Sequence, residues 1–136
     1  MKKLLILLIC FFGIMCCYSQ NKVEQSNFCK IATENGKASS KHFQKSYFTH
    51  DNNNTLIQVM YLSELAADSN QDYSIMSKES KETGYVDKLV EMILKTYKSN
   101  DYEFYNTLRS YGFTHFQVIQ IDNNNIKNKS KRYIIN

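Results

Sequence analysis

The chain has 136 residues, with 17 Lys or Arg residues, 13 Asp or Glu residues and a formal net charge of +4 at pH 7. This length is typical of one domain. The motifs of serine hydrolases, P-loop proteins and dinucleotide-binding proteins are missing, and four glycines leave no glycine-rich loop to bind a phosphate. These properties exclude several common enzyme classes, and they specify no activity.

The first 19 residues have the pattern of an export signal. Two lysines precede an uncharged apolar run at residues 4–15, which is shorter than the about 20 residues needed to span a bilayer. Cys17 and Ser19 are the small residues that signal peptidase requires, and they predict cleavage before Gln20. We therefore expect an exported protein, periplasmic or secreted, of the bacterial cell envelope.

The same segment also has features of a lipoprotein signal, in which Cys17 would be lipidated and would anchor the protein to the membrane. Ile14 is an acceptable aliphatic residue for such a signal, but Met15 is bulky where small residues are usual. Removal of the signal takes away Lys2 and Lys3 and no acidic residue, which leaves 15 basic against 13 acidic residues and a net charge of +2. Nucleic-acid binding is therefore not expected.

The polar residues 20–26 are expected to form a tether, and residues 27–136 are expected to form a single small domain. Residues 28–33 are a short strand candidate, and the Asn35-Gly36 dipeptide after them favours a tight hairpin turn. A second, half-exposed strand is expected within residues 38–49, where the alternation of polar and apolar residues becomes clear only near its end.

The next segment contains the most apolar strand of the chain. A turn is predicted at residues 51–54, because Asp and Asn tolerate left-handed backbone and bond their own main chain. Residues 55–65 follow with apolar side chains on both faces, which is typical of a central strand or of one covered on both sides. Residues 66–82 are polar and are expected to form a long, mobile loop that is competent to bind a partner.

A long amphipathic helix is predicted to begin near residue 83, with an apolar stripe that continues to Leu108 and a break at residues 99–101. Gly112 is placed to close this helix in a left-handed conformation. A strand is predicted at residues 113–121 because aromatic and β-branched residues are frequent there. The apolar stripe of the helix contains Val86, Leu89, Val90, Ile93, Leu94, Tyr97, Phe104, Tyr105 and Leu108.

A second Asp-Asn-Asn-Asn turn at residues 122–125 is expected to return the chain as a C-terminal strand within residues 126–135. The predicted order β-β-β-α-β-β indicates an α+β fold: a mainly antiparallel sheet of about five strands with one long, broken helix packed across one face. A parallel pair remains open as an alternative, since the helix could connect two parallel strands.

Three residues are weak candidates for chemistry. Cys29 is the only cysteine after the signal, so an internal disulfide is excluded, and a buried apolar role is its ordinary explanation. His50 and His115 would form a joint site only if their strands were neighbours. No Cys or His spacing indicates a metal site, and no cofactor is expected.

The last strand has the clearest charge pattern. Lys127, Lys129 and Lys131 alternate and would share one face with Tyr133 if the strand were regular. Such a face could bind an anionic glycan or lipid surface. The alternative is an edge strand that lysines protect from aggregation.

The leading hypothesis is a small exported non-enzymatic domain that binds an envelope partner through a sheet edge or through residues 66–82. One alternative is a small secreted enzyme that uses His50, His115 or Cys29. The other is a lipid-tethered accessory subunit of an envelope complex.

Overall fold

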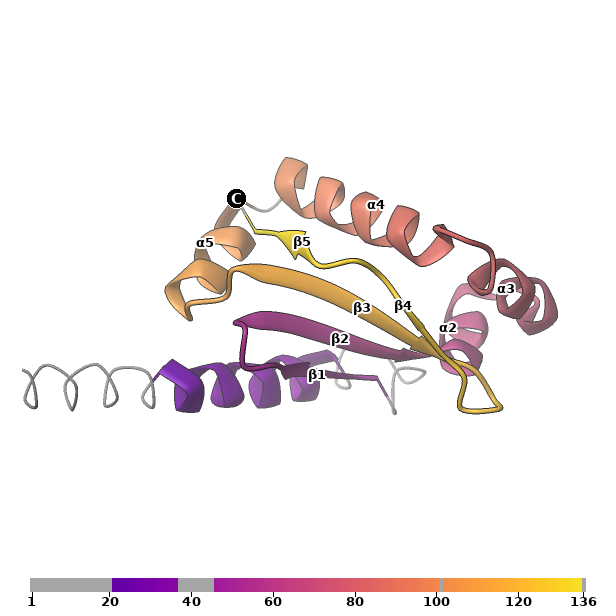
Figure 1. The fold of residues 1–136 in the computed structure, drawn as a ribbon, viewed down its shortest axis with the longest axis horizontal. Coiled ribbons are helices and arrows are strands. Elements are labelled where there is room, and N and C mark those ends of the chain that lie inside the picture. The colour runs from indigo at the N-terminus through magenta and orange to yellow at the C-terminus, as the bar shows by residue number, and fades with distance from the viewer. Residues whose placement is uncertain (1–20, 37–45, 101, 136) are drawn as a thin grey trace, which may run out of the picture.

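A computed structural model of the chain describes residues 21–36, 46–100 and 102–135 (Figure 1). It contains a mixed five-stranded sheet. An N-terminal helix precedes β1 and β2, four helices follow, and β3, β4 and β5 complete the order. The predicted α+β class is therefore confirmed. The predicted order β-β-β-α-β-β is wrong, because the chain has a helix where the first strand was expected and further helices between β2 and β3.

The sheet is built from two hairpins that meet at a parallel pair. β1 (Tyr47–His50) and β2 (Thr55–Tyr61) are antiparallel, and β2 runs parallel to β3 (His115–Ile121). β3 then pairs antiparallel with β4 (Lys127–Lys129) and with β5 (Tyr133–Ile134). A parallel pair needs a long crossover connection, which the helices between β2 and β3 provide. The sheet is thus mixed rather than mainly antiparallel.

The described chain begins with a helix at residues 21–36. The predictions of a tether at residues 20–26 and a strand at residues 28–33 are therefore wrong for the described residues. Gln25 and Cys29, four residues apart, are both buried, as expected for the inner side of a helix. The hydropathy pattern of the sequence did not reveal this buried side of the helix, because one of its buried residues is a glutamine.

The N-terminal helix packs against the end of the core and against the edge of β1. The Phe28 ring centroid lies 4.9 Å from that of Tyr111 and 5.5 Å from that of Phe113. Thr33 Oγ1 accepts a hydrogen bond of 2.8 Å from the backbone N–H of Phe48 in β1. The helix therefore occupies an edge of the sheet that would otherwise be open to another strand.

The predicted hairpin turn at Asn35-Gly36 is also wrong, because both residues belong to the N-terminal helix. The strand expected within residues 38–49 is confirmed in part, since β1 contains residues 47–50. Residues 37–45 lie outside the described residues, and so does the whole export or lipoprotein signal with Cys17.

Both Asp-Asn-Asn-Asn turns are confirmed, and they share one geometry. Asp51 Oδ1 accepts hydrogen bonds from the backbone N–H groups of Asn53 (2.8 Å) and Thr55 (2.9 Å). Asn54 has a positive φ of 58°. The second turn repeats these features with Asp122 as acceptor, Asn124 and Ile126 as donors, and Asn125 at a φ of 59°.

The long loop predicted at residues 66–82 is wrong. The second half of α2 (Leu62–Ser69) and all of α3 (Tyr73–Ser80) lie in this segment. Asn70, with a left-handed φ of 53°, ends α2, and Asp72 caps α3. The first half of α2, with Leu62 and Leu65, lies inside the stretch predicted as a strand, and the polar composition of residues 66–82 concealed the rest of α2 and all of α3.

A small second core explains why these helices form. Leu62, Ala66 and Met76 are buried together, with Tyr73 packed against them. The predicted strand at residues 55–65 is correct only as far as Tyr61, because the next residue begins α2. The prediction that this strand is central is confirmed, since β2 lies between β1 and β3.

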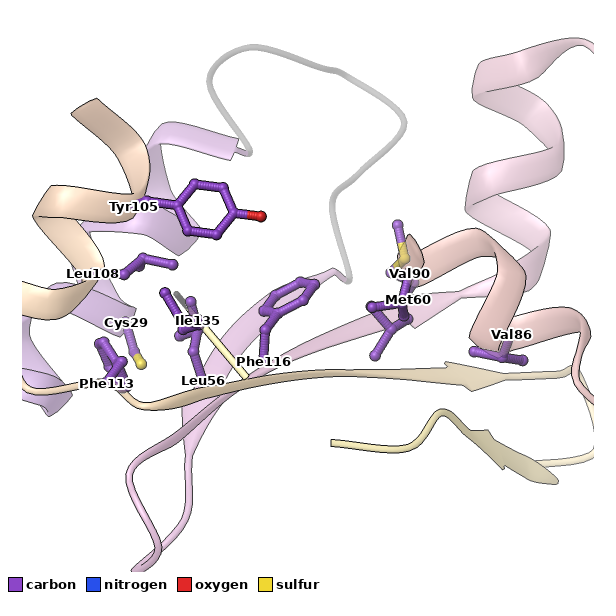
Figure 2. Close-up of a cluster of buried hydrophobic side chains, with 11 residues drawn as sticks. Cys29, Leu56, Met60, Val86, Val90, Tyr105, Leu108, Phe113, Phe116 and Ile135 are labelled. Atoms are coloured by element: carbon purple, nitrogen blue, oxygen red, sulfur yellow. The ribbon is translucent and has the colours of Figure 1, made fainter. Parts of the chain in front are cut away.

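α4 (Tyr85–Asn100) and α5 (Tyr102–Ser110) confirm the two predicted helical segments. Of the break predicted at residues 99–101, residues 99 and 100 belong to α4, and residue 101 lies outside the described residues. Val86 and Val90 of α4 reach the main core, and Tyr105 and Leu108 of α5 do the same. Figure 2 shows these side chains on the same side of the strands as Leu56 and Phe116. The full set of buried residues in this cluster is Cys29, Leu56, Met60, Val86, Val90, Tyr105, Leu108, Phe113, Phe116, Val118 and Ile135.

The predicted glycine cap after α5 is also confirmed. Gly112 has a φ of +74°. Its N–H donates to the Arg109 carbonyl at 2.8 Å, and the N–H of Phe113 donates to the Leu108 carbonyl at 3.1 Å. These two hydrogen bonds define a Schellman motif, which directs the chain from α5 into β3.

Candidate binding surface

The sheet has a second face, opposite the core, which we call the open face. Successive side chains of a strand point to opposite faces. Leu56 and Met60 of β2 belong to the core, so the residues between them point the other way. The pairing registers then assign the open face to Tyr47, Thr49, Thr55, Ile57, Val59, Tyr61, His115, Gln117, Ile119, Ile121, Lys127, Lys129 and Ile134.

Seven of the 13 residues of the open face are aliphatic or tyrosine and six are polar or charged, and the described parts of the chain form no hydrophobic cluster against this face. None of its residues belongs to either described hydrophobic cluster. Tyr47 is 39% exposed and Ile134 is 63% exposed. Ile57 and Ile119, near the centre, are half-buried by their neighbours within the sheet. Thr55, Val59 and Ile121 of this face are buried, so its accessible apolar surface lies mainly at Tyr47, Ile57, Ile119 and Ile134.

One border of the open face is cationic. Lys127 and Lys129 of β4 are exposed, and they lie opposite Ile121 and Ile119 in the pairing register. Among the described strand residues of this face there is no Asp or Glu. The opposite border, at Tyr47 of β1, is uncharged.

The predicted cationic face of the last strand is only partly formed. Residues 130–132 interrupt the strand between β4 and β5. The Ser130 hydroxyl takes part in this interruption, because it accepts a hydrogen bond of 3.0 Å from the Val118 N–H. Lys131 and Tyr133 are therefore not on the face of Lys127 and Lys129, as strict alternation would require.

Lys131 and Tyr133 instead contact α4. The Lys131 N–H donates to Asp87 Oδ1 at 2.6 Å, and its ammonium lies 3.8 Å from Asp87 Oδ2. The Tyr133 hydroxyl lies 3.2 Å from both the Asp87 carbonyl oxygen and Glu91 Oε1. Burial and then the negative charge of Asp87 raise the pKa of Tyr133. These residues attach the C-terminal strand to α4.

The two candidate histidines do not share a site. His50 pairs in register with Leu56, a core-facing residue, whereas His115 pairs with Thr55 of the open face. His50 Nε2 lies 2.8 Å from Ser26 Oγ. His115 Nδ1 lies 2.8 Å from Thr114 Oγ1. Because the rings are on opposite faces of the sheet, the proposed joint site has no structural support.

Cys29 lies in the main core and is 5% exposed. Burial raises the pKa of its thiol to about 11. A thiol with this pKa is protonated at neutral pH and is a poor nucleophile. The position of Cys29 therefore agrees with a buried apolar role.

Two hollows formed by described residues lie on the helical side of the molecule. One, of about 240 Å³, lies between the α3–α4 corner and β4, and its lining includes Glu82, Asp87 and the β4 lysines Lys127 and Lys129. The other, of about 230 Å³, lies along α3 beside Asp72, Ile75 and Glu79. Neither lining contains a histidine or a cysteine. Both are open and carry no arrangement of a nucleophile with a base.

Sequence reasoning did not identify the open face. The relevant signal was present in residues 55–61, which are apolar on both sides. It indicated a strand that needs cover on two faces, but only the register with β3 shows which residues form the second face.

Among the described residues, no three His, Cys, Asp or Glu side chains are placed to hold a metal ion. None of the described helices has the length and apolar character needed to cross a membrane. Comparison of the chain with protein-family models, with curated proteins and with solved structures finds no match.

Proposed function

We propose that the chain is a non-catalytic module that binds a partner protein on the open face. The observation that carries this proposal is the central β2–β3 pair, which is parallel and has aliphatic side chains on both faces. Parallel strands are usually covered on both faces, since an exposed apolar face loses the free energy of burial. The core covers one face, so a partner would supply the second cover.

A protein fits this surface better than a lipid bilayer does. Ile57 and Ile119 are half-buried within the sheet and do not project as a wedge. Gln117 lies in the middle of the face and donates a hydrogen bond of 2.6 Å from Nε2 to the Ser130 carbonyl oxygen, and its amide oxygen would have no solvent partner in a hydrocarbon environment. A protein can offer both apolar contacts and hydrogen bonds in one surface.

The size of the face predicts a weak complex. β2 and β3 have seven residues and are about 23 Å long, whereas β1 has four residues and β4 has three. Four strands span about 15 Å, so the face covers at most about 350 Å². An interface of this size buries about 700 Å² in total, below the range of stable complexes. A transient interaction is therefore expected.

The open face replaces the two surfaces that the sequence suggested for binding. The edge of β1 is occupied by the N-terminal helix, through Thr33 and Phe48. The other edge is formed by β4, a strand of three residues of which two are lysines. Residues 66–82 are mainly helical rather than a loop.

The export pattern of residues 1–19 places the proposed partner in the cell envelope or outside the cell. Lipidation of Cys17 would make the module a tethered accessory of an envelope complex. In both cases the binding surface is the same.

The proposal is tested by affinity capture with two matched double variants. The first, Tyr47→Glu with Ile134→Glu, places charges on the open face. The control, Ile31→Glu with Ile75→Glu, changes two exposed isoleucines on helices, which are 58% and 56% exposed. A partner retained by the wild type and the control but lost by the open-face variant supports the proposal. A partner retained by the open-face variant overturns it.

A further inference from the structure

We infer that the partner covers the open face with an amphipathic helix whose carboxylates lie beside Lys127 and Lys129. This inference rests on the proposed function and names the occupant of the same surface. It follows from the shape of the face, the condition of the sheet edges and the distribution of charge.

The shape of the face favours a helix. A helix is about 10 Å wide, so it covers two strands that are about 4.8 Å apart. The two central strands, β2 and β3, carry Ile57, Val59, Ile119 and Ile121 on this face. A helix of about 16 residues spans about 24 Å, which is the length of these strands. On the core face, α4 already packs in this way, with 16 residues against β3.

The sheet edges disfavour an extended peptide. Strand addition requires a free row of backbone N–H and C=O groups. The Phe48 N–H of β1 is already bonded to Thr33 Oγ1. At the other edge, β4 offers three residues before residues 130–132 interrupt the strand. A partner strand would therefore gain few backbone hydrogen bonds.

The charges of the open face determine which side of the partner helix should be acidic. Lys127 and Lys129 form no salt bridge within the described residues. Two carboxylates near β4 are already engaged, because Asp87 is paired with Lys131 and Asp122 lies 3.7 Å from Lys81. Glu82 lines the hollow beside β4 with both lysines but forms no described salt bridge with them. A helix with carboxylates on the β4 side would complement both free lysines, while its β1 side, beside Tyr47, can be neutral.

A second copy of the chain is a poorer occupant. The described strand residues of the open face include no Asp or Glu. Two open faces packed together would bury apolar area but leave four lysines without a carboxylate. Charge complementarity therefore indicates a different protein.

The inference is tested with a display library of amphipathic helical peptides. Each peptide carries a fixed leucine stripe, and the positions on both flanks are randomised among Glu, Lys and Gln. Selection on the wild-type chain is expected to enrich peptides with Glu on one flank and neutral residues on the other. The selected peptides should become helical on binding, as measured by circular dichroism.

A charge exchange then locates the contact. Lys127→Glu with Lys129→Glu should weaken the selected peptides by about tenfold or more, and Lys-flanked versions should regain affinity for this variant. The control, Lys30→Glu with Lys88→Glu, has the same net charge but changes exposed residues on helices. An equal loss of peptide affinity in both variants, or the absence of a charge preference in the selected peptides, overturns the inference.

The outcomes also separate this inference from the proposed function. If no helical peptide is enriched but capture still depends on the open face, the helical occupant is wrong and the binding module stands. If capture does not depend on the open face, both fail. If the library yields nothing and vesicles of phosphatidylglycerol bind the wild type but not the lysine variant, the surface contacts lipid and both proposals are overturned.

Discussion

Lys129 of β4 lies directly opposite Ile119 of β3, and both side chains point away from the core. This pair places a cationic border beside the apolar centre of the open face. The same register puts Lys127 beside Ile121. An uncovered apolar surface with charge on one side distinguishes this sheet from one that simply faces water.

The packing of the core predicts that a substitution at Leu108 strongly lowers the free energy of unfolding. This side chain is fully buried between α5 and the sheet. Leu108→Ala should lower the free energy of unfolding by about 3 kcal/mol, because it removes buried area and leaves a cavity. Met92→Ala, at an exposed position of α4, should change it by less than about 0.5 kcal/mol. Urea denaturation measures both, and equal effects would contradict the assigned core.

The Schellman cap predicts a cost for a side chain at Gly112. A Cβ at this position would lie 2.7 Å from the Asn21 side chain, and the φ of +74° is unfavourable for alanine. Gly112→Ala should destabilise the chain by about 1–2 kcal/mol. Gly36→Ala is the matched control, since no atom lies within 4 Å of its Cβ and the residue is helical. Gly36→Ala should be neutral or stabilising, and the opposite order of the two variants would refute the cap.

Asp51 should make stability depend on pH. Burial raises the pKa of this carboxyl, but hydrogen bonds from Thr55 and Asn53 and the charge of Arg132 outweigh burial and lower it. A lowered folded-state pKa stabilises the protein above the unfolded pKa of about 4, and this contribution is lost as the pH falls through the folded value. Asp51→Asn should therefore be less stable than the wild type at pH 7.

The difference between wild type and Asp51→Asn should shrink as the solution is acidified below about pH 4. Unfolding in urea at a series of pH values measures it. Glu24→Gln, at an exposed position of the N-terminal helix, is the control for loss of one negative charge. A difference that stays constant across the range would show that the carboxylate charge is not involved.

Cys29 should react slowly with thiol reagents in the folded protein. Its pKa of about 11 leaves little thiolate at pH 8, and its side chain is in the core. Labelling followed by peptide mapping should show little modification of Cys29 under native conditions and rapid modification in urea. Fast native labelling would contradict the burial of Cys29 and would restore the hypothesis of a reactive thiol.

The parts of the fold that were predictable from the sequence are those in which local signals agree. The stripe of α4 and α5, the cap at Gly112 and the residues of β3 all indicate one structure, and the two Asp-Asn-Asn-Asn turns have strong local chemistry. The N-terminal helix and α3 were missed because few apolar residues mark their inner sides. Gln25, for example, is fully buried, which a pattern based on hydropathy does not predict.

The candidate surface was less predictable because it depends on pairing between distant segments. The alternation of Lys127, Lys129 and Lys131 suggested one cationic face. The interruption at residues 130–132 assigns Lys131 to Asp87 and leaves only the first two lysines on the open face. The apolar part of that face comes mainly from β2 and β3, whose parallel register could not be read from either strand alone.

Isoleucine methyl NMR tests the central claim most directly, because isoleucines lie both on the open face and on the helices. With a partner obtained by capture, we predict that the methyl signals of Ile57, Ile119 and Ile134 shift or broaden, whereas those of Ile31 and Ile75 stay in place. Shifts confined to Ile31 or Ile75, with the open-face methyl signals unchanged, would contradict the account.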